Sequence, residues 1–197
     1  MFQNGMSLLS GVLAIAGYVP YIAAILRGPS RPSKATWLIW SLLDTIVLYG
    51  MVSKHVANGQ IVGAMIGAWI VFALSLKYGT LGWKPLDRWC LGGTALGLIL
   101  WYTFDSPMLG MMTSLCLMFI GSFPTFVSAW KNPGHENRLA WAIYLASCMS
   151  ALIAVPAWNL ENAAQPVTFS SVSVIMMYIL FTPRKRGMRN LDKEITQ

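Results

Sequence analysis

Long runs of apolar residues, separated by short polar stretches, dominate the chain. Each run extends for about 18–22 residues, the length of α-helix that crosses roughly 30 Å of hydrocarbon. The intervening stretches carry helix breakers such as Gly28-Pro29, Asn58-Gly59 and Asp105-Ser106-Pro107. The pattern predicts an all-α membrane protein with seven transmembrane helices, at residues 6–27, 35–53, 60–78, 86–104, 108–130, 138–157 and 166–183.

The composition supports this interpretation. Of the 197 residues, 56% are hydrophobic and 11% are charged, whereas a soluble domain carries about 25% charged residues. Most of the outer surface must therefore face an apolar medium. The connections are too short for a soluble catalytic domain, and the first apolar run has no preceding positive charge and no cleavage motif, so we expect it to remain in the mature protein.

The basic residues are distributed unevenly between the two sides of the predicted bundle. Numbering the sides alternately along seven spans leaves only Lys54 on one side, out of 14 lysines and arginines. The positive-inside rule then places the N-terminus outside and the C-terminus in the cytoplasm. The net charge of +7 then reflects basic residues at the cytoplasmic membrane surface, where anionic lipids attract them. We expect the basic tail to anchor the last helix rather than to bind nucleic acid.

An internal repeat is visible at a constant offset. Residues 17–37 align without a gap with residues 121–141, so that Pro20 matches Pro124 and Trp37 matches Trp141. Each repeat has three helices, and a linker helix between them restores a common orientation, which makes the repeats parallel. The predicted organisation is a first repeat at 1–80, a linker helix at 81–105, a second repeat at 106–184 and a basic cytoplasmic tail at 185–197.

This organisation resembles the PQ-loop and SWEET superfamily of small-solute transporters. Those proteins have three helices, a linker helix and three further helices, with a proline in the first helix of each repeat. The resemblance covers nearly the whole chain in topology, and about residues 17–41 and 121–145 in motif. The Pro-Gln dipeptide of the PQ-loop family is replaced here by Pro20-Tyr21 and Pro124-Thr125. The resemblance implies a transporter whose repeats rock against each other.

Nicotinamide riboside transporters are a second point of resemblance. They share the topology and use tryptophans around their substrate, which Trp37, Trp40 and Trp141 would supply here.

The two matched prolines are candidates for hinges. Pro20 and Pro124 lack an N–H and clash with the preceding turn, so we expect each to kink its helix. The alternative is a role in packing alone.

Asp44 is the one acidic residue well inside a predicted span. A charge at that depth costs at least about 3 kcal/mol on insertion scales, so we expect Asp44 to be protonated or to face water. It is a candidate for binding substrate or carrying a coupling proton; the alternative is a neutral carboxyl group that bonds a neighbouring residue. The repeat places Cys148 at the equivalent position.

Aromatic residues accompany Asp44 on one helix face. Trp37, Trp40 and Asp44 follow one another at spacings of three and then four residues. Rings beside a polar group suit a flat or sugar-like solute, although Trp37 also fits an interfacial anchor. Further candidates for the substrate site are the equivalent positions in the second repeat, Trp141 and Tyr144. A matched pair in the third helix of each repeat, Trp69 and Ser173, completes the candidates.

These observations favour a transporter of a small polar or aromatic solute such as a sugar, nucleoside or vitamin, as a facilitator or coupled to protons. The alternative is a membrane receptor or sorting protein on the same topology. No catalytic set or metal-ligand spacing is evident, so we expect no enzyme activity, no catalytic residue, no cofactor and no metal. The expected partners are the solute and the lipid bilayer of a plasma or inner membrane; a monomer suffices, and a homo-oligomer remains possible.

Overall fold

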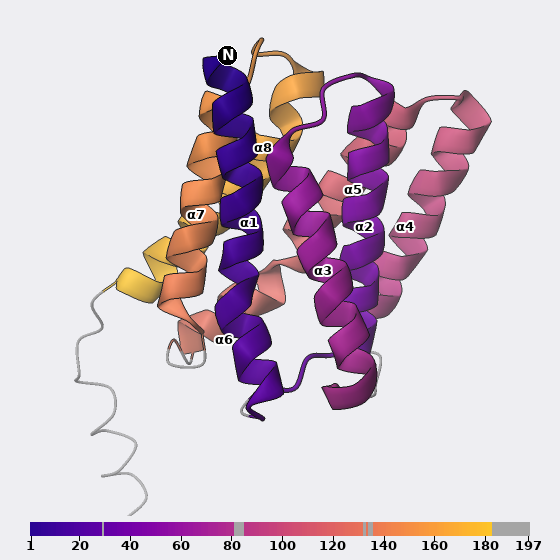
Figure 1. The fold of residues 1–197 in the computed structure, drawn as a ribbon. Helices are drawn as coiled ribbons and strands as arrows, with labels where there is room; N and C mark the ends of the chain where they lie inside the picture. Colours follow the sequence, from indigo (N-terminus) through magenta and orange to yellow (C-terminus); the bar gives the residue numbers. More distant parts are fainter. Residues whose placement is uncertain (29, 81–84, 132, 134–135, 183–197) are drawn as a thin grey trace, which may run out of the picture.

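The computed structural model describes residues 1–28, 30–80, 85–131, 133 and 136–182. The predicted basic tail at 185–197 therefore lies outside the described residues. Apart from an isolated bridge between Ser33 and Thr80, the described residues form no β-structure. Figure 1 shows the helices, which are α1 (Phe2–Leu26), α2 (Lys34–Ser53), α3 (Gly59–Tyr78), α4 (Pro85–Phe104), α5 (Pro107–Gly121), α6 (Phe123–Lys131), α7 (Arg138–Ile153) and α8 (Leu160–Phe181).

Short polar side chains begin four of these helices. The first N–H groups of a helix have no partner within it, and a serine or asparagine oxygen at the N-cap satisfies one of them. Such hydrogen bonds occur at α2, α3, α7 and α8, where the caps are Ser33, Asn58, Asn137 and Asn159.

The helix predicted at 108–130 corresponds to one apolar segment, Pro107–Lys131, in which a turn at Ser122 separates α5 from α6. Two predicted boundaries were wrong. The helix predicted at 138–157 ends at Ile153, so Pro156 follows it. The last helix begins at Leu160 rather than at 166, because Asn159 caps it and Pro166 lies inside it.

Five segments are long and apolar enough to cross a membrane. They are α1, α2, α3, α8 and the segment Pro107–Lys131, which comprises α5 and α6. The described apolar parts of α4 and α7 are shorter than this criterion requires. Together with the apolar exterior, these helices indicate an integral membrane protein.

The exterior of the bundle is apolar. Along one face of α1, Leu8, Val12, Ile15 and Val19 are all exposed. Their spacing of three or four residues gives an uninterrupted apolar stripe, as expected of a helix that faces lipid tails. The interior holds a separate cluster from five helices, with Leu43, Met51, Ile61, Met111 and Leu115 among its most buried members.

Six helical segments form a closed ring. Going round it, α1 packs against α3, α3 against α2, α2 against α5, the α5–α6 segment against α8, α8 against α7, and α7 returns to α1. The remaining helix, α4, lies outside the ring against α5 and α2. The ring brings together helices that are far apart in the sequence, especially α1 with α7.

Glycines allow α1 and α3 to approach closely. A side chain at Gly59 would collide with the backbone of Ser7, and one at Gly63 would collide with the backbone of Gly11. Small residues are the usual means by which membrane helices pack backbone against backbone.

The two ends of the bundle differ in charge. The N-terminus, the α2–α3 connection and the α7–α8 connection lie at one end, called here the N-terminal end (Figure 1). The other end, called here the basic end, carries most of the described lysines and arginines, among them Arg27, Lys34, Lys77, Lys131 and Arg138.

Candidate functional site

Three helices of the ring bring polar side chains together at its centre. Asp44 of α2 lies within electrostatic range of the side chains of Tyr18 on α1 and Tyr144 on α7. A side chain at Gly17 would lie 3.6 Å from the Cβ atom of Tyr144, which shows how closely α1 and α7 pack here. We call Tyr18, Asp44 and Tyr144 the central site.

Asp44 is the least satisfied member of the central site. Its side chain is buried, with 4% exposure, and its Oδ1 accepts no hydrogen bond from any residue that the structure describes. Buried polar atoms are normally paired, and an orphaned oxygen calls for an explanation such as a functional role. The oxygen is available to a proton, a water molecule or a solute donor.

An aromatic cluster extends from the central site along α1 and α2. The ring centroid of Trp37 lies 6.2 Å from that of Tyr18, 5.4 Å from that of Tyr21 and 5.6 Å from that of Trp40. Trp40 lies on the face of α2 opposite the exposed residue Tyr49, yet remains partly exposed. The predicted face of Trp37, Trp40 and Asp44 therefore points into the ring of helices.

The equivalent residues of α7 are divided between two settings. Tyr144 joins the central site, and its ring centroid lies 6.4 Å from that of Phe169. Trp141 lies one turn away and donates from its indole nitrogen to Oε2 of Glu136 at 3.0 Å, with its ring centroid 6.4 Å from that of Tyr144. Trp141 thus borders the site near the start of α7.

Trp69 and Ser173 occupy unlike surroundings, although their positions match in the repeats. The indole nitrogen of Trp69 donates to the hydroxyl of Thr45 at 3.0 Å on an exposed flank of α2 and α3. Ser173 is fully buried and lies 3.3 Å from the thiol of Cys148. The structure therefore brings Ser173, but not Trp69, into the interior beside the central site.

A chain of three hydrogen bonds, two of them buried, connects this interior with the N-terminal end. Asn58 donates to Gln165 at 2.8 Å, Gln165 donates to Gln60 at 3.0 Å, and Gln60 donates to the thiol of Cys148 at 3.0 Å. Gln60 and Gln165 are fully buried. We call Asn58, Gln165 and Gln60 the amide chain. It joins α3 of the first half to α7 and α8 of the second.

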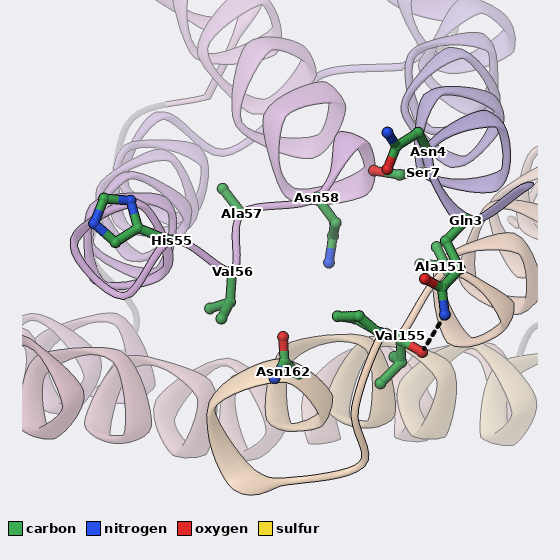
Figure 2. Close-up of a pocket in the computed structure, with 12 residues that line it drawn as sticks. Gln3, Asn4, Ser7, His55, Val56, Ala57, Asn58, Ala151, Val155 and Asn162 are labelled. Carbon is green, nitrogen blue, oxygen red and sulfur yellow. Dashed lines mark hydrogen bonds between the residues drawn. The ribbon is translucent and has the colours of Figure 1, made fainter. Parts of the chain in front are cut away.

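A cavity of about 200 Å³, which Asn58 helps to line, lies at the N-terminal end (Figure 2). It lies between the start of α1, the α2–α3 connection and the ends of α7 and α8 that meet there. The cavity is lined by polar and small apolar residues, including Gln3, Asn4, Ser7, His55, Asn58 and Asn162. We call it the N-terminal cavity.

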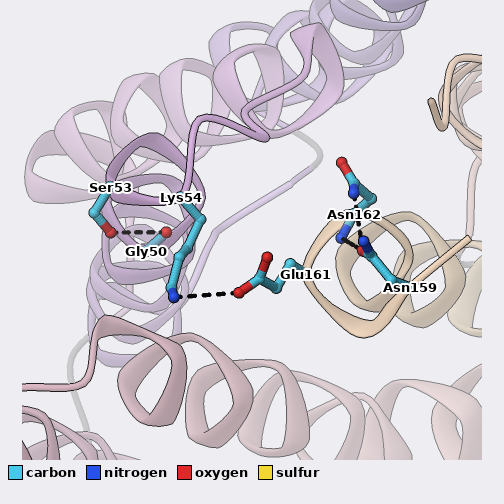
Figure 3. Close-up of polar contacts among 6 residues, drawn as sticks. All are labelled: Gly50, Ser53, Lys54, Asn159, Glu161 and Asn162. Carbon is cyan, nitrogen blue, oxygen red and sulfur yellow. Dashed lines mark hydrogen bonds and ion pairs between the residues drawn. The ribbon is translucent and has the colours of Figure 1, made fainter. Parts of the chain in front are cut away.

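An ion pair bridges the two halves beside this cavity. Nζ of Lys54, at the end of α2, lies 3.2 Å from Oε1 of Glu161 in the first turn of α8 (Figure 3). Both side chains are about two-fifths exposed (38% and 41%). Exposed pairs of this kind contribute roughly 0–1 kcal/mol, so the pair is a weak link between the halves.

The two candidate hinge prolines have different settings. Helix α1 continues through Pro20 without interruption. Pro124 is the second residue of α6, just after the turn at Ser122. The backbone N–H of Ser122 donates to the oxygen of Met118, and that of Phe126 donates to the oxygen of Ser122, so hydrogen bonds still connect α5 with α6.

Sequence analysis missed Tyr18 and both glutamines of the amide chain. Gln165 lies one residue before the predicted start of the last helix at 166, so the sequence pattern does not indicate that it is buried. Gln60 lies in the first turn of α3, where a polar residue is ordinary. The available signal was a polar amide near the start of each third helix, at positions 60 and 165, which are almost one repeat apart.

Comparison with known proteins assigns the chain to no family: no family model matches it, and neither a curated protein nor a solved structure matches it. Among the described residues, no group of three or more His, Cys, Asp or Glu side chains is arranged to hold a metal ion.

Proposed function

We infer that this chain is a membrane transporter of a small polar or aromatic solute, which passes through the ring of helices as two three-helix repeats rock against each other. The observation that carries this proposal is Asp44, a buried carboxyl group with an orphaned oxygen at the junction of α1, α2 and α7. Ionisable residues at such positions in membrane proteins typically mark substrate or proton pathways.

The contacts within the ring support the two repeats. Exchanging α1 with the α5–α6 segment, α2 with α7 and α3 with α8 converts every contact of the ring into another of its contacts. The contact of α1 with α7, for example, becomes that of α5 with α2. This is the relationship expected of parallel repeats around an axis along the membrane normal. In this proposal α4 is the linker, and α4 and α7 complete seven spans.

The central site lies where these repeats would move. Tyr18 and Asp44 belong to the first repeat and Tyr144 to the second, so rocking alters the space between them. The aromatic cluster offers ring faces for stacking, and the carboxyl group offers a hydrogen bond, a combination that orients a flat or hydroxyl-rich solute. In a proton-coupled cycle, Asp44 would bind the proton in one orientation and release it in the other.

The charge of the two ends supports an orientation. The positive-inside rule assigns the basic end to the cytoplasm and the N-terminal end to the outside. A plasma or inner membrane suits this arrangement, with one chain sufficient for a complete pathway.

Uptake by proteoliposomes tests the proposal. The purified chain should take up at least one solute from a panel of sugars, nucleosides, vitamins and amino acids, measured with and without a pH gradient, while empty liposomes should not. A chain that binds a protein partner but moves no solute under either condition would instead favour a receptor or sorting protein.

A further inference from the structure

The N-terminal cavity is separate from the central site and has its own chemistry. Its lining offers side-chain amides from Gln3, Asn4, Asn58 and Asn162 and a hydroxyl group from Ser7. Gln3 donates to the backbone oxygen of Val155 at 3.4 Å, which ties α1 to the α7–α8 connection. These groups provide hydrogen-bond donors and acceptors on several sides of one space.

The size of the cavity suits a small solute. About 200 Å³ is the space of roughly six or seven water molecules. Pockets for drug-sized ligands are larger, at about 300–1,000 Å³. The cavity therefore fits one compact molecule rather than a peptide or a lipid.

The lining indicates a solute without charge. None of the described residues that line the cavity is Asp, Glu, Lys or Arg. The nearest acid and base along the chain, Glu161 and Lys54, bond each other. Of the lining residues that the structure describes, His55 alone has an ionisable side chain. A charged solute would lose its hydration in the cavity without meeting a carboxylate, an ammonium or a guanidinium group, which is costly.

The amide chain forms the floor between this cavity and the interior. Asn58 lines the cavity and also donates to Gln165. From there two further hydrogen bonds lead through Gln60 to Cys148, which is fully buried. A solute that moves from Asn58 toward Cys148 would meet these hydrogen bonds.

We propose that the N-terminal cavity is an outer binding site for a small uncharged solute with hydrogen-bonding groups. The amide chain is the barrier between this cavity and the central site. Both statements rest on the proposed transport function.

Cys148 provides a built-in reporter for the barrier. In a Cys90→Ser, Cys116→Ser background it is the one remaining cysteine. A membrane-impermeant methanethiosulfonate, applied to the face that carries the N-terminus, should label it slowly. Gln165→Leu removes two hydrogen bonds of the chain and should raise the labelling rate about ten-fold. Gln60→Leu, which also removes two, provides a second variant should the first fail to fold.

Ser171→Ala is the matched control for the barrier. Its hydroxyl group bonds only the backbone of its own helix at Val167, among the bonds that the structure describes. The labelling rate should be unchanged in this variant. Equal rates in the background, Gln165→Leu and Gln60→Leu proteins would overturn the barrier.

Isosteric probes test the charge selectivity of the cavity. Benzamide should slow the labelling of Cys148 in the Gln165→Leu background, whereas benzoate and benzamidinium at the same concentration should not. Ribose and ribonate make a second uncharged and charged pair. Asn162→Ala should weaken the protection by benzamide and by ribose. The proposed binding site would be contradicted if neither benzamide nor ribose slowed the labelling of Cys148. It would also be contradicted if the charged probes slowed the labelling equally.

The two proposals fail in different ways. If the probes protect Cys148 and the glutamine variants speed its labelling, but the chain transports no solute, the binding site would be supported and the transport function contradicted. Solute uptake with no effect of Gln165→Leu or Gln60→Leu on Cys148 would keep the transport function and remove the barrier.

Discussion

The side-chain amide of Gln60 donates to the thiol of Cys148, with 3.0 Å between Nε2 and Sγ. Gln60 is the second residue of α3 and Cys148 lies within α7, so the bond joins the two halves of the ring in its interior. Both residues are fully buried. A buried amide without a partner costs free energy, so the bond favours the arrangement in which α3 and α7 remain together at this level.

Trp40 is expected to contribute to solute binding through its ring face. Trp40→Ala should weaken the affinity for the transported solute about five-fold, since the loss of a stacking contact of this kind removes around 1 kcal/mol. Titration of the purified protein with the transported solute measures the effect.

Trp69→Ala is the matched control. Trp69 bonds Thr45 on the exposed flank of the bundle, so its removal should leave the affinity unchanged. Equal losses in Trp40→Ala and Trp69→Ala, or none in Trp40→Ala, would exclude Trp40 from the site.

The sequence allowed much of the fold to be predicted because apolar length and breaker residues are local signals. Asn58-Gly59 and Pro107 mark the starts of α3 and α5. Pro166 misled the prediction, because a proline in the first turns of a helix resembles a helix start, and only the cap at Asn159 shows otherwise.

The candidate site was predicted only where one helix determines it. The spacing of Trp37, Trp40 and Asp44 gives a common face without further information. The pairing of Gln60 with Gln165, 105 residues apart, depends on how α3 and α8 lie in the ring, which no local pattern encodes. Tyr18 was missed for the same reason, since its partners come from α2 and α7.

Gly67 is expected to be required for the position of Tyr18. A side-chain atom at Gly67 would collide with the Tyr18 ring, so Gly67→Ala should lower the stability by roughly 1–3 kcal/mol through overpacking. The thermal midpoint of the purified protein in detergent, followed by tryptophan fluorescence, measures this.

Gly92→Ala in α4 provides the comparison for that variant. A Cβ atom there meets nothing within 4 Å, and alanine favours helix formation over glycine by about 1 kcal/mol. Its midpoint should equal or exceed that of the original chain. If both variants melted at the same temperature, the close contact of α1 and α3 at Gly67 would be contradicted.

The two ends of the bundle are expected on opposite faces of the membrane. In a chain with its cysteines replaced by serine, Phe2→Cys should react with an impermeant maleimide in intact cells. Lys77→Cys, at the basic end of α3, should react only after permeabilisation. Labelling of both positions from the same face would rule out the proposed topology.

The most direct test of the proposed mechanism is the uptake of the transported solute into proteoliposomes under an inward proton gradient, compared between the original chain and Asp44→Asn. The amide keeps the shape of the carboxyl group but cannot exchange a proton at neutral pH. The account predicts that the original chain accumulates solute in response to the gradient and that Asp44→Asn, at equal levels of folded protein, loses this response. Full gradient-driven accumulation by Asp44→Asn would contradict it.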